Sequence, residues 1–234
     1  MALGLLWLGL LLGDLSVQAL DSIPGMTEIP PLDKFPLQPD FQEHQFQGRW
    51  YAIGLAQHTF KNKCLRQPAM YMITYELKDD SSYNATYTWV SDQGCDHKSD
   101  PMVPSDQPGQ FILDNITRSE KYTMRVLATD YNQTAIVLRV SILKNRVYFE
   151  NILYGRTMEL SPEMEMQYIE VSKSLGFSDD HITITAPMAD GHLAERHKVP
   201  SYCIKSYHAR EQSRISLLQC NDPKPSPPKP RRRR

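Results

Sequence analysis

Short hydrophobic runs alternate with polar positions between residues 49 and 154, and they predict antiparallel strands. The runs are rich in Tyr, Ile, Val, Thr and Phe and recur at roughly 8–12-residue spacing. Polar turns separate them, among them Asp79-Asp80-Ser81-Ser82, Gln107-Pro108-Gly109 and Tyr131-Asn132-Gln133. This spacing is typical of an antiparallel all-β sandwich or barrel. Because closure removes sheet edges and about eight strands leave room for one small ligand, we expect an eight-stranded up-and-down barrel.

The run at residues 134–142 is apolar on its outer face, and this predicts a helix packed against the barrel. That face holds Ile136, Leu138, Val140 and Ile142, and an apolar outer face needs a cover. Ser161 is a good N-cap, Pro162 suits the first helical position and Gly176 can end the helix. The stripe Met164, Tyr168, Val171 and Leu175 would contact the sheet. We therefore expect one packed C-terminal α-helix, followed by a short strand at residues 181–185.

The glycosylation sequon at Asn84 orients the predicted strands. A glycan must point to solvent, and side chains alternate along a strand, so Tyr83, Tyr87 and Trp89 should point inward. On the preceding strand the inward residues are then Tyr71, Ile73, Tyr75 and Leu77. The interior is therefore expected to be rich in aromatic rings with a polar group.

The chain divides into four regions. Residues 1–19 are predicted to be a secretory signal, because an apolar run from Leu3 to Leu12 precedes the small-x-small pattern Val17-Gln18-Ala19. An N-terminal anchor is the alternative, but the run is shorter than the ~20 apolar residues of a membrane span. Residues 20–44 hold five prolines and suggest an extended arm. Residues 45–190 form the barrel and helix, and residues 191–234 form an atypical extension.

Secretion predicts an oxidising compartment in which the four cysteines can form disulfides. Cys64, Cys95, Cys203 and Cys220 allow three pairings, among which the spacing does not choose. Two further sequons, at Asn115 and Asn132, agree with a secreted, extracellular glycoprotein.

The net charge is −1, but the last thirteen residues contain two Lys, four Arg and one Asp. The basic character therefore belongs to a tail and not to a folded nucleic-acid surface. The Pro-rich spacer and four arginines could bind a polyanion or a cell-surface receptor, or form a solvated tail without a role. His192, His197, Cys203 and His208 match no zinc spacing, so we predict no metal and no cofactor.

Three short motifs resemble the signature regions of the lipocalins, in the same order. They are Gly48-Arg49-Trp50, Thr129-Asp130-Tyr131 and Gly155-Arg156. The resemblance covers about residues 1–190, and it implies that Trp50 closes one end of the barrel beneath Arg156 in a cation–π contact. These roles are structural.

Lipocalins that bind ferric siderophores do so through inward-facing cations. Carried over by position, those cations fall on Asp100, Ser141 and Glu150, so all three are absent here. A cavity Trp becomes Lys98 and a cavity Phe becomes Arg139. We expect Lys98 and Arg139 to balance Asp100 and Glu150, and such a pocket does not concentrate a strongly anionic ligand.

The same resemblance predicts an aromatic ligand pocket. Its expected lining is Tyr71, Ile73, Tyr87, Trp89, Lys98, Tyr122, Arg139 and Tyr154. We predict a monomeric carrier of a small hydrophobic ligand, retinoid- or fatty-acid-like, whose carboxylate meets Arg139 or Lys98. The alternatives are siderophore sequestration, and a protein- or polyanion-binding module that acts through its surface and basic tail while the rings simply fill the barrel.

The resemblance also bears on the cysteines. The family disulfide joins the strand of Cys95 to the C-terminal segment, but the usual partner position lacks Cys. Cys203 is the nearest candidate and Cys220 the next. A Cys203–Cys220 bond, with Cys64 free or paired to Cys95, stays open. An enzymatic lipocalin uses a Cys on its second strand, where this chain has Met70-Tyr71-Met72, so we predict no catalysis.

Overall fold

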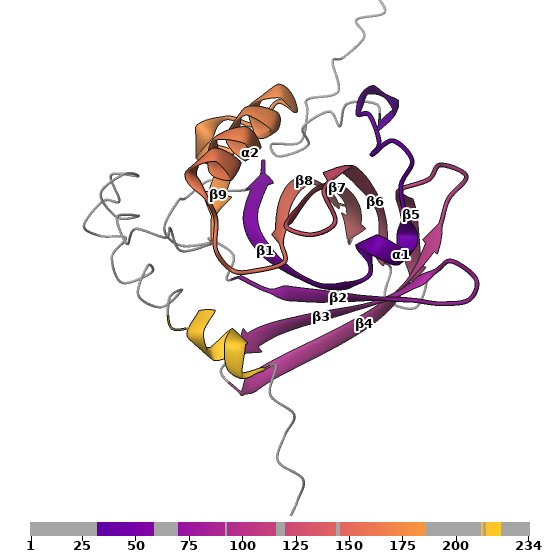
Figure 1. Cartoon of the computed structure of the whole chain (residues 1–234), viewed down its shortest axis with the longest axis horizontal. Coiled ribbons are helices and arrows are strands. Elements are labelled where there is room, and N and C mark those ends of the chain that lie inside the picture. The colour runs from indigo at the N-terminus through magenta and orange to yellow at the C-terminus, as the bar shows by residue number, and fades with distance from the viewer. Residues whose placement is uncertain are drawn as a thin grey trace, which may run out of the picture.

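The computed structural model describes residues 32–58, 70–91, 93–115, 120–143, 146–185, 212 and 214–220, and it shows a closed antiparallel barrel (Figure 1). The strands are β1 (Gly48–Gln57), β2 (Met72–Leu77), β3 (Tyr83–Ser91), β4 (Gly94–Pro104), β5 (Gln110–Asn115), β6 (Glu120–Thr129), β7 (Thr134–Leu143), β8 (Arg146–Gly155) and β9 (Ile182–Ile184). The helices are α1 (Glu43–Phe46) and α2 (Pro162–Ser174), with 3-10 turns η1 (Leu32–Lys34) and η3 (Asp179–His181).

Strand β1 closes the barrel because it pairs with strands on both sides. Its first part pairs with β2, from Gly48 opposite Tyr75, and its later part pairs with β8, down to Gln57 opposite Glu150. Strands β2 to β8 pair in chain order. Strand β9 pairs with the later part of β1, on the side opposite β8. The predicted eight-stranded up-and-down barrel is confirmed, as is the additional short strand.

The alternation inferred from Asn84 is confirmed. Tyr83 and Ala85 of β3 belong to the inner cluster of buried side chains, and Tyr75 of β2 packs against Tyr83 with ring centroids 5.4 Å apart. Met72, one residue out of phase, belongs instead to the outer cluster. Aromatic rings therefore fill much of the barrel, together with aliphatic and Met side chains.

Helix α2 covers the apolar outer face of the barrel, as expected (Figure 1). The Ser161 hydroxyl accepts a hydrogen bond from the Met164 amide at 3.3 Å, so the predicted N-cap is present. Tyr168 is fully buried and donates a hydrogen bond to the Asn151 carbonyl of β8 at 2.7 Å. A Cβ on Gly54 would lie 2.8 Å from the Tyr168 ring, so glycine in β1 permits this close approach.

The described part of the N-terminal region packs on the barrel and corrects the expectation of an extended arm at residues 20–44. Phe35 and Phe41 are buried. The Gln38 amide donates to the Val126 carbonyl at 2.9 Å, and the buried Arg125 donates to the Phe35 carbonyl at 2.9 Å. The five prolines of residues 20–44 leave little periodicity, so the local sequence did not indicate this packing. Residues 20–31 lie outside the described residues.

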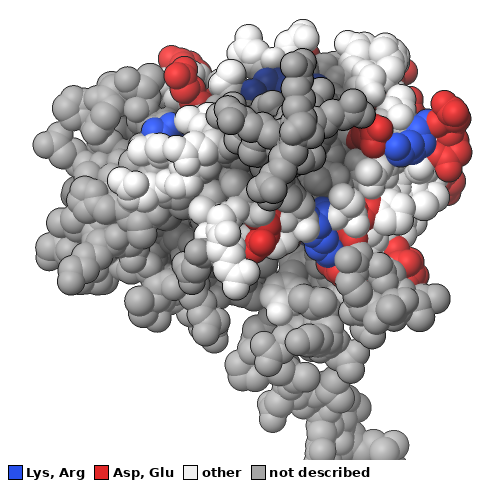
Figure 2. All heavy atoms as spheres, turned by 90° about the horizontal axis from the view of Figure 1, so that it is seen from below, with Lys and Arg blue, Asp and Glu red and all other residues white. Residues whose placement is uncertain are grey.

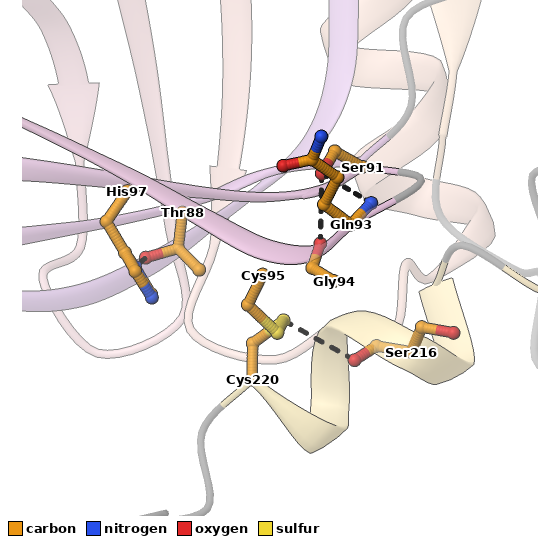
Figure 3. The surroundings of a disulfide bond; sticks show 8 residues. All are labelled: Thr88, Ser91, Gln93, Gly94, Cys95, His97, Ser216 and Cys220. Atoms are coloured by element: carbon orange, nitrogen blue, oxygen red, sulfur yellow. Dashed lines mark hydrogen bonds between the residues drawn. A yellow bond between two sulfur atoms is a disulfide. The ribbon is translucent and has the colours of Figure 1, made fainter.

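The disulfide joins Cys95 of β4 to Cys220, which corrects the expected Cys95–Cys203 pairing (Figure 3). The two Cα atoms are 5.7 Å apart, within the range for a disulfide. Cys220 ends a helical segment at residues 214–220, which lies beside β3 and β4 in Figure 1 and buries Leu217 completely. Proximity in sequence favoured Cys203, whereas the packing of this segment brings Cys220 to β4.

Several predicted features lie outside the described residues: the signal segment 1–19, Cys64, Cys203, the histidines at 192, 197 and 208, and the basic tail. Within the described part of the chain, no helix has the length and apolar character needed to cross a membrane.

We predict that the double variant Cys95→Ser, Cys220→Ser is less stable by about 2–4 kcal/mol, because the bond closes a long loop in the unfolded chain. The free energy of unfolding in urea measures this. Leu218→Ser is the matched control, since it places the same residue at an exposed position of the same segment and should change stability by less than about 0.5 kcal/mol. Equal stability of the double variant and the wild type would show that the Cys95–Cys220 bond does not stabilise the fold.

Candidate functional site

Arg156 and Trp50 close one end of the barrel. The Arg156 guanidinium lies 3.6 Å from the Trp50 ring centroid, and it donates to the carbonyls of Tyr131, Arg49 and Gln45 at 2.8–2.9 Å. A Cβ at Gly48 would lie 3.3 Å from this guanidinium, and Gly48 has a φ of +93° that favours glycine. The structure thus places the Gly48, Trp50 and Arg156 motif residues together.

The Thr129-Asp130-Tyr131 motif forms the turn beside this lock. The Thr129 hydroxyl donates to the Thr134 carbonyl, and Asp130 accepts from the amides of Gln133 and Thr134, all at 2.8 Å. These bonds hold Tyr131 at a φ of 64° and aim its carbonyl at Arg156. The three motifs therefore build one closed end of the barrel. Only the opposite end is left for contact with a ligand.

A cavity of about 650 Å³ occupies the opposite end, where β1 reaches Gln57. Its described lining is Gln57, Tyr71, Tyr87, Trp89, Val90, Lys98, Asp100, Glu120, Tyr122, Arg139, Ser141, Tyr148 and Glu150. A volume of this size suits one small molecule.

Six of the eight residues expected to contact a ligand line this cavity: Tyr71, Tyr87, Trp89, Lys98, Tyr122 and Arg139. The other two, Ile73 and Tyr154, are buried in the inner cluster and do not line it. Sequence reasoning missed Gln57, Val90, Glu120 and Tyr148. Strand alternation could have found Glu120 and Tyr148, because they lie two residues from Tyr122 and Glu150 on the same face.

Arg139 and Glu150 form a closed ion pair across β7 and β8. The Arg139 Nε and Nη2 atoms lie 2.6 and 2.5 Å from the same Glu150 oxygen, and the other oxygen accepts from Gln57 at 2.8 Å. Burial acts to lower the pKa of Arg139, but the charge of Glu150 outweighs it and leaves that pKa well above its usual range. Arg139 is therefore always charged, and its charge is compensated.

Lys98 lies between two carboxylates. Its Nζ is 2.9 Å from Asp100, whose side chain is fully buried, and 2.7 Å from Glu120. Desolvation opposes its charge, yet the hydrogen bonds to Glu120 and Asp100 prevail and raise the pKa of Lys98. The expected balance of Lys98 with Asp100 and of Arg139 with Glu150 is present, and Glu120 adds a further negative charge.

Two tyrosines of the cavity lining, Tyr71 and Tyr122, remain neutral at physiological pH. Burial raises the pKa of Tyr71 to about 12, and burial together with Tyr87 raises that of Tyr122 well above its ordinary value. The Tyr87 and Tyr122 hydroxyls are 3.0 Å apart. The buried Tyr71 hydroxyl makes no hydrogen bond of full geometry to a described residue, although Tyr154 lies close enough to favour its ionised form.

The described residues give no sign of a metal centre: no group of three or more His, Cys, Asp or Glu side chains among them could hold a metal ion. The described cavity lining contains no cysteine, and Cys95 is engaged in the disulfide. Absence of catalysis stays a prediction.

Comparison with known proteins decides the family. The Lipocalin / cytosolic fatty-acid binding protein family matches residues 47–189, more than half of the chain. The chain belongs to the lipocalin family. Human neutrophil gelatinase-associated lipocalin is 45% identical over 192 residues, covering 80% of this chain and 97% of that protein.

Two epididymal relatives agree with this lipocalin assignment. Human epididymal-specific lipocalin-12 is 33% identical over 149 residues, covering 63% of this chain and 77% of that protein. A solution NMR structure of lipocalin 12 from rat epididymis matches with a TM-score of 0.59 at 25% identity, covering 68% of this chain and 93% of that one. The expected resemblance to the lipocalins is confirmed.

Two sequons of this lipocalin, at Asn84 and Asn132, lie away from the described cavity lining. Asn84 is half-buried on the outer side of β3, and Asn132 is exposed in the turn before β7. Asn115 ends β5, and its side chain lies outside what the structure describes. Glycosylation of these positions stays a prediction.

Tyr71 should make stability fall with rising pH. Its pKa is about 12 in the folded protein, against about 10 when unfolded, so the folded state keeps the proton longer and loses stability above about pH 10. We expect Tyr71→Phe to remove about 1.3 kcal/mol of the decrease in unfolding free energy between about pH 9 and pH 11. Urea unfolding at both pH values measures it, and an unchanged pH slope would contradict the burial of this hydroxyl.

Proposed function

We propose that this lipocalin is a secreted, non-catalytic carrier that buries one small hydrophobic molecule of retinoid- or fatty-acid-like shape. The observation that carries the proposal is the cavity of about 650 Å³ with aromatic rings from Tyr71, Tyr87, Trp89 and Tyr122 in its wall. Such rings offer flat apolar surfaces to a planar or chain-like body. Transfer of that body from water into the cavity drives binding without any chemical step.

The polar end of the ligand needs a separate argument. The expectation of a carboxylate on Arg139 or Lys98 required at least one cation to be available. Both contact protein carboxylates instead, at 2.5–2.9 Å. A ligand carboxylate would have to compete with these ion pairs. The cavity therefore supports binding of the apolar part of such a ligand, and gives no support for the expected contact with its carboxylate.

Filling the cavity should abolish binding. Ser141→Phe adds a ring on the cavity face of β7, whereas Ile142→Phe adds the same ring on the exposed outer face one residue later. Titration with retinol, followed by quenching of Trp89 fluorescence, should show at least about tenfold weaker binding for Ser141→Phe and less than twofold change for Ile142→Phe. Equal affinities for the two variants, both with wild-type circular dichroism, would place the ligand elsewhere.

Siderophore sequestration is the alternative that relatedness to neutrophil gelatinase-associated lipocalin brings forward. The positions where siderophore binding needs cations hold Asp100, Ser141 and Glu150, and the structure places all three in the cavity wall. We therefore expect a strongly anionic ferric tris-catecholate to show no binding by fluorescence quenching. Tight uptake would overturn this charge argument.

Binding of a polyanion or receptor through the surface is the second alternative. On the face seen in Figure 2, basic and acidic side chains of the described residues lie next to each other, without a broad area of one sign. Such a mixed surface does not favour a polyanion. A role for residues 221–234, and the expected monomeric state, stay predictions.

A further inference from the structure

We propose that the helical segment at residues 214–220, together with the basic residues that follow it, docks on an anionic lipid bilayer. This docking surface lies beside the cavity entrance, so a docked protein presents that entrance to the membrane. The proposal rests on the disulfide, on exposed apolar side chains of the segment and on the charge of residues 221–234. It does not require the proposed carrier function.

The disulfide places the helical segment at the rim of the cavity. In the register of β3 and β4, Val90 lies opposite Cys95. Trp89 and Val90 are part of the cavity lining, so the hairpin that joins the two strands lies at the cavity end of the barrel. The bond from Cys95 to Cys220 therefore fixes the helical segment beside this rim (Figure 3).

The helical segment has one packed side and one exposed apolar side. Leu217 is completely buried in the outer cluster, whereas Ile215 and Leu218 are 43% and 48% exposed. At about 100° per residue, Ile215 and Leu218 lie only about 60° apart around the helix, and Leu217 lies about 100° or more from each. Two large apolar side chains therefore point away from the barrel together, in a position from which they can enter the interface of a bilayer.

The chain after this segment is strongly basic. Residues 221–234 hold six basic side chains and one acidic side chain, a formal charge of +5. Lys224 follows Cys220 by four residues, so chain length alone keeps it within about 15 Å of the disulfide. Because each basic side chain near an anionic lipid surface adds to the attraction, this stretch complements the charge of acidic headgroups.

The combination of apolar and basic side chains favours a bilayer over other polyanions. A sulfated polysaccharide offers anionic groups but no apolar phase for Ile215 and Leu218. Attachment of a protein to a bilayer commonly combines an apolar group with a polybasic patch. Here the apolar pair lies beside the cavity rim, and the basic residues follow it directly in the chain.

The position of the docking surface bears on the proposed carrier function. A hydrophobic ligand is poorly soluble in water and concentrates in lipid. With the entrance held at the membrane, such a ligand would pass between bilayer and cavity with little exposure to bulk water. This consequence rests on the proposed function, whereas the docking itself does not.

Vesicle binding tests the proposal. Protein purified from the medium of expressing cells is used, because secretion removes the predicted signal at residues 1–19. We expect at least about tenfold stronger binding to vesicles of phosphatidylcholine and phosphatidylserine in equal parts than to phosphatidylcholine alone, measured by co-sedimentation in low salt. Raising the ionic strength to about 0.5 M should remove this difference.

Single charge removals test whether the basic residues act locally. Arg232→Gln removes one charge from the stretch after the disulfide and should weaken binding to anionic vesicles about fivefold. Lys78→Gln is the matched control, because it removes one positive charge just after β2, where the side chain is 46% exposed and does not line the cavity. This control should change binding by less than twofold.

Paired polar substitutions test the apolar side of the segment. The double variant Ile215→Ser, Leu218→Ser should bind anionic vesicles at least about fivefold more weakly, because less apolar surface leaves water. The double variant Val103→Ser, Met166→Ser is the matched control, since these side chains are 56% and 59% exposed on β4 and α2. It should bind like the wild type, and circular dichroism shows whether both variants are folded.

A tryptophan reporter tests the orientation. Leu218→Trp places an indole ring on the docking surface, and Val103→Trp places one near the other end of β4. With brominated lipid in anionic vesicles, we expect quenching of Leu218→Trp to exceed that of the wild type clearly. Quenching of Val103→Trp should equal that of the wild type.

The outcomes separate the docking proposal from the carrier function. Equal binding to neutral and anionic vesicles, equal losses in Arg232→Gln and Lys78→Gln, or equal quenching of both tryptophan variants overturns the docking proposal. Retention on heparin without vesicle binding also overturns it, because the partner is then a polysaccharide. Retinol binding by a protein that ignores vesicles leaves the carrier function standing, whereas vesicle binding without any retinoid binding supports docking and counts against the carrier function.

Discussion

The contact between Arg156 and Trp50 determines which end of this barrel can hold a ligand. One guanidinium covers the indole ring at 3.6 Å and reaches carbonyls of three separate segments, so the strand β1, the turn before β7 and the approach to β1 all meet at one point. A barrel fixed at one end is a cup with one remaining entrance. Inward side chains beyond Trp50 face either packed rings or the cavity, and only those near the entrance can meet a ligand.

Charge pairing is the second constraint on the interior. An ion in a partly desolvated wall is costly unless an opposite charge lies beside it, and both cations in the described lining of this cavity have such partners. Arg139 and Glu150 satisfy each other across neighbouring strands. Lys98 contacts two carboxylates at once, those of Asp100 and Glu120. Glu120, at the start of β6, thus takes part in the charge pairing of the described cavity lining.

The outer face of the barrel buries a cluster of hydrophobic side chains, as the inner face does. Tyr168 of α2 packs over Gly54 and bonds to β8, and Phe35 packs against Phe149 from the N-terminal side. The segment at residues 214–220 adds Leu217 to the same outer cluster, and the disulfide from Cys220 secures it to β4. Elements from near both ends of the described chain therefore pack against the barrel strands from outside.

The sequence by itself determined the strands, their inward faces, the helix with its Ser161 cap and the three motifs of the closed end. The strands repeat with a period of two residues and the helix with about 3.6, and each motif lies within a few consecutive residues, so local spacing suffices to find them. Tertiary structure alone decided that Cys220 reaches Cys95, that the N-terminal region packs on the barrel, and that Glu120 joins Lys98. The physical reason is the same in each case: the partners are 22 to 125 residues apart in the chain, and only strand pairing and packing set the distance between them.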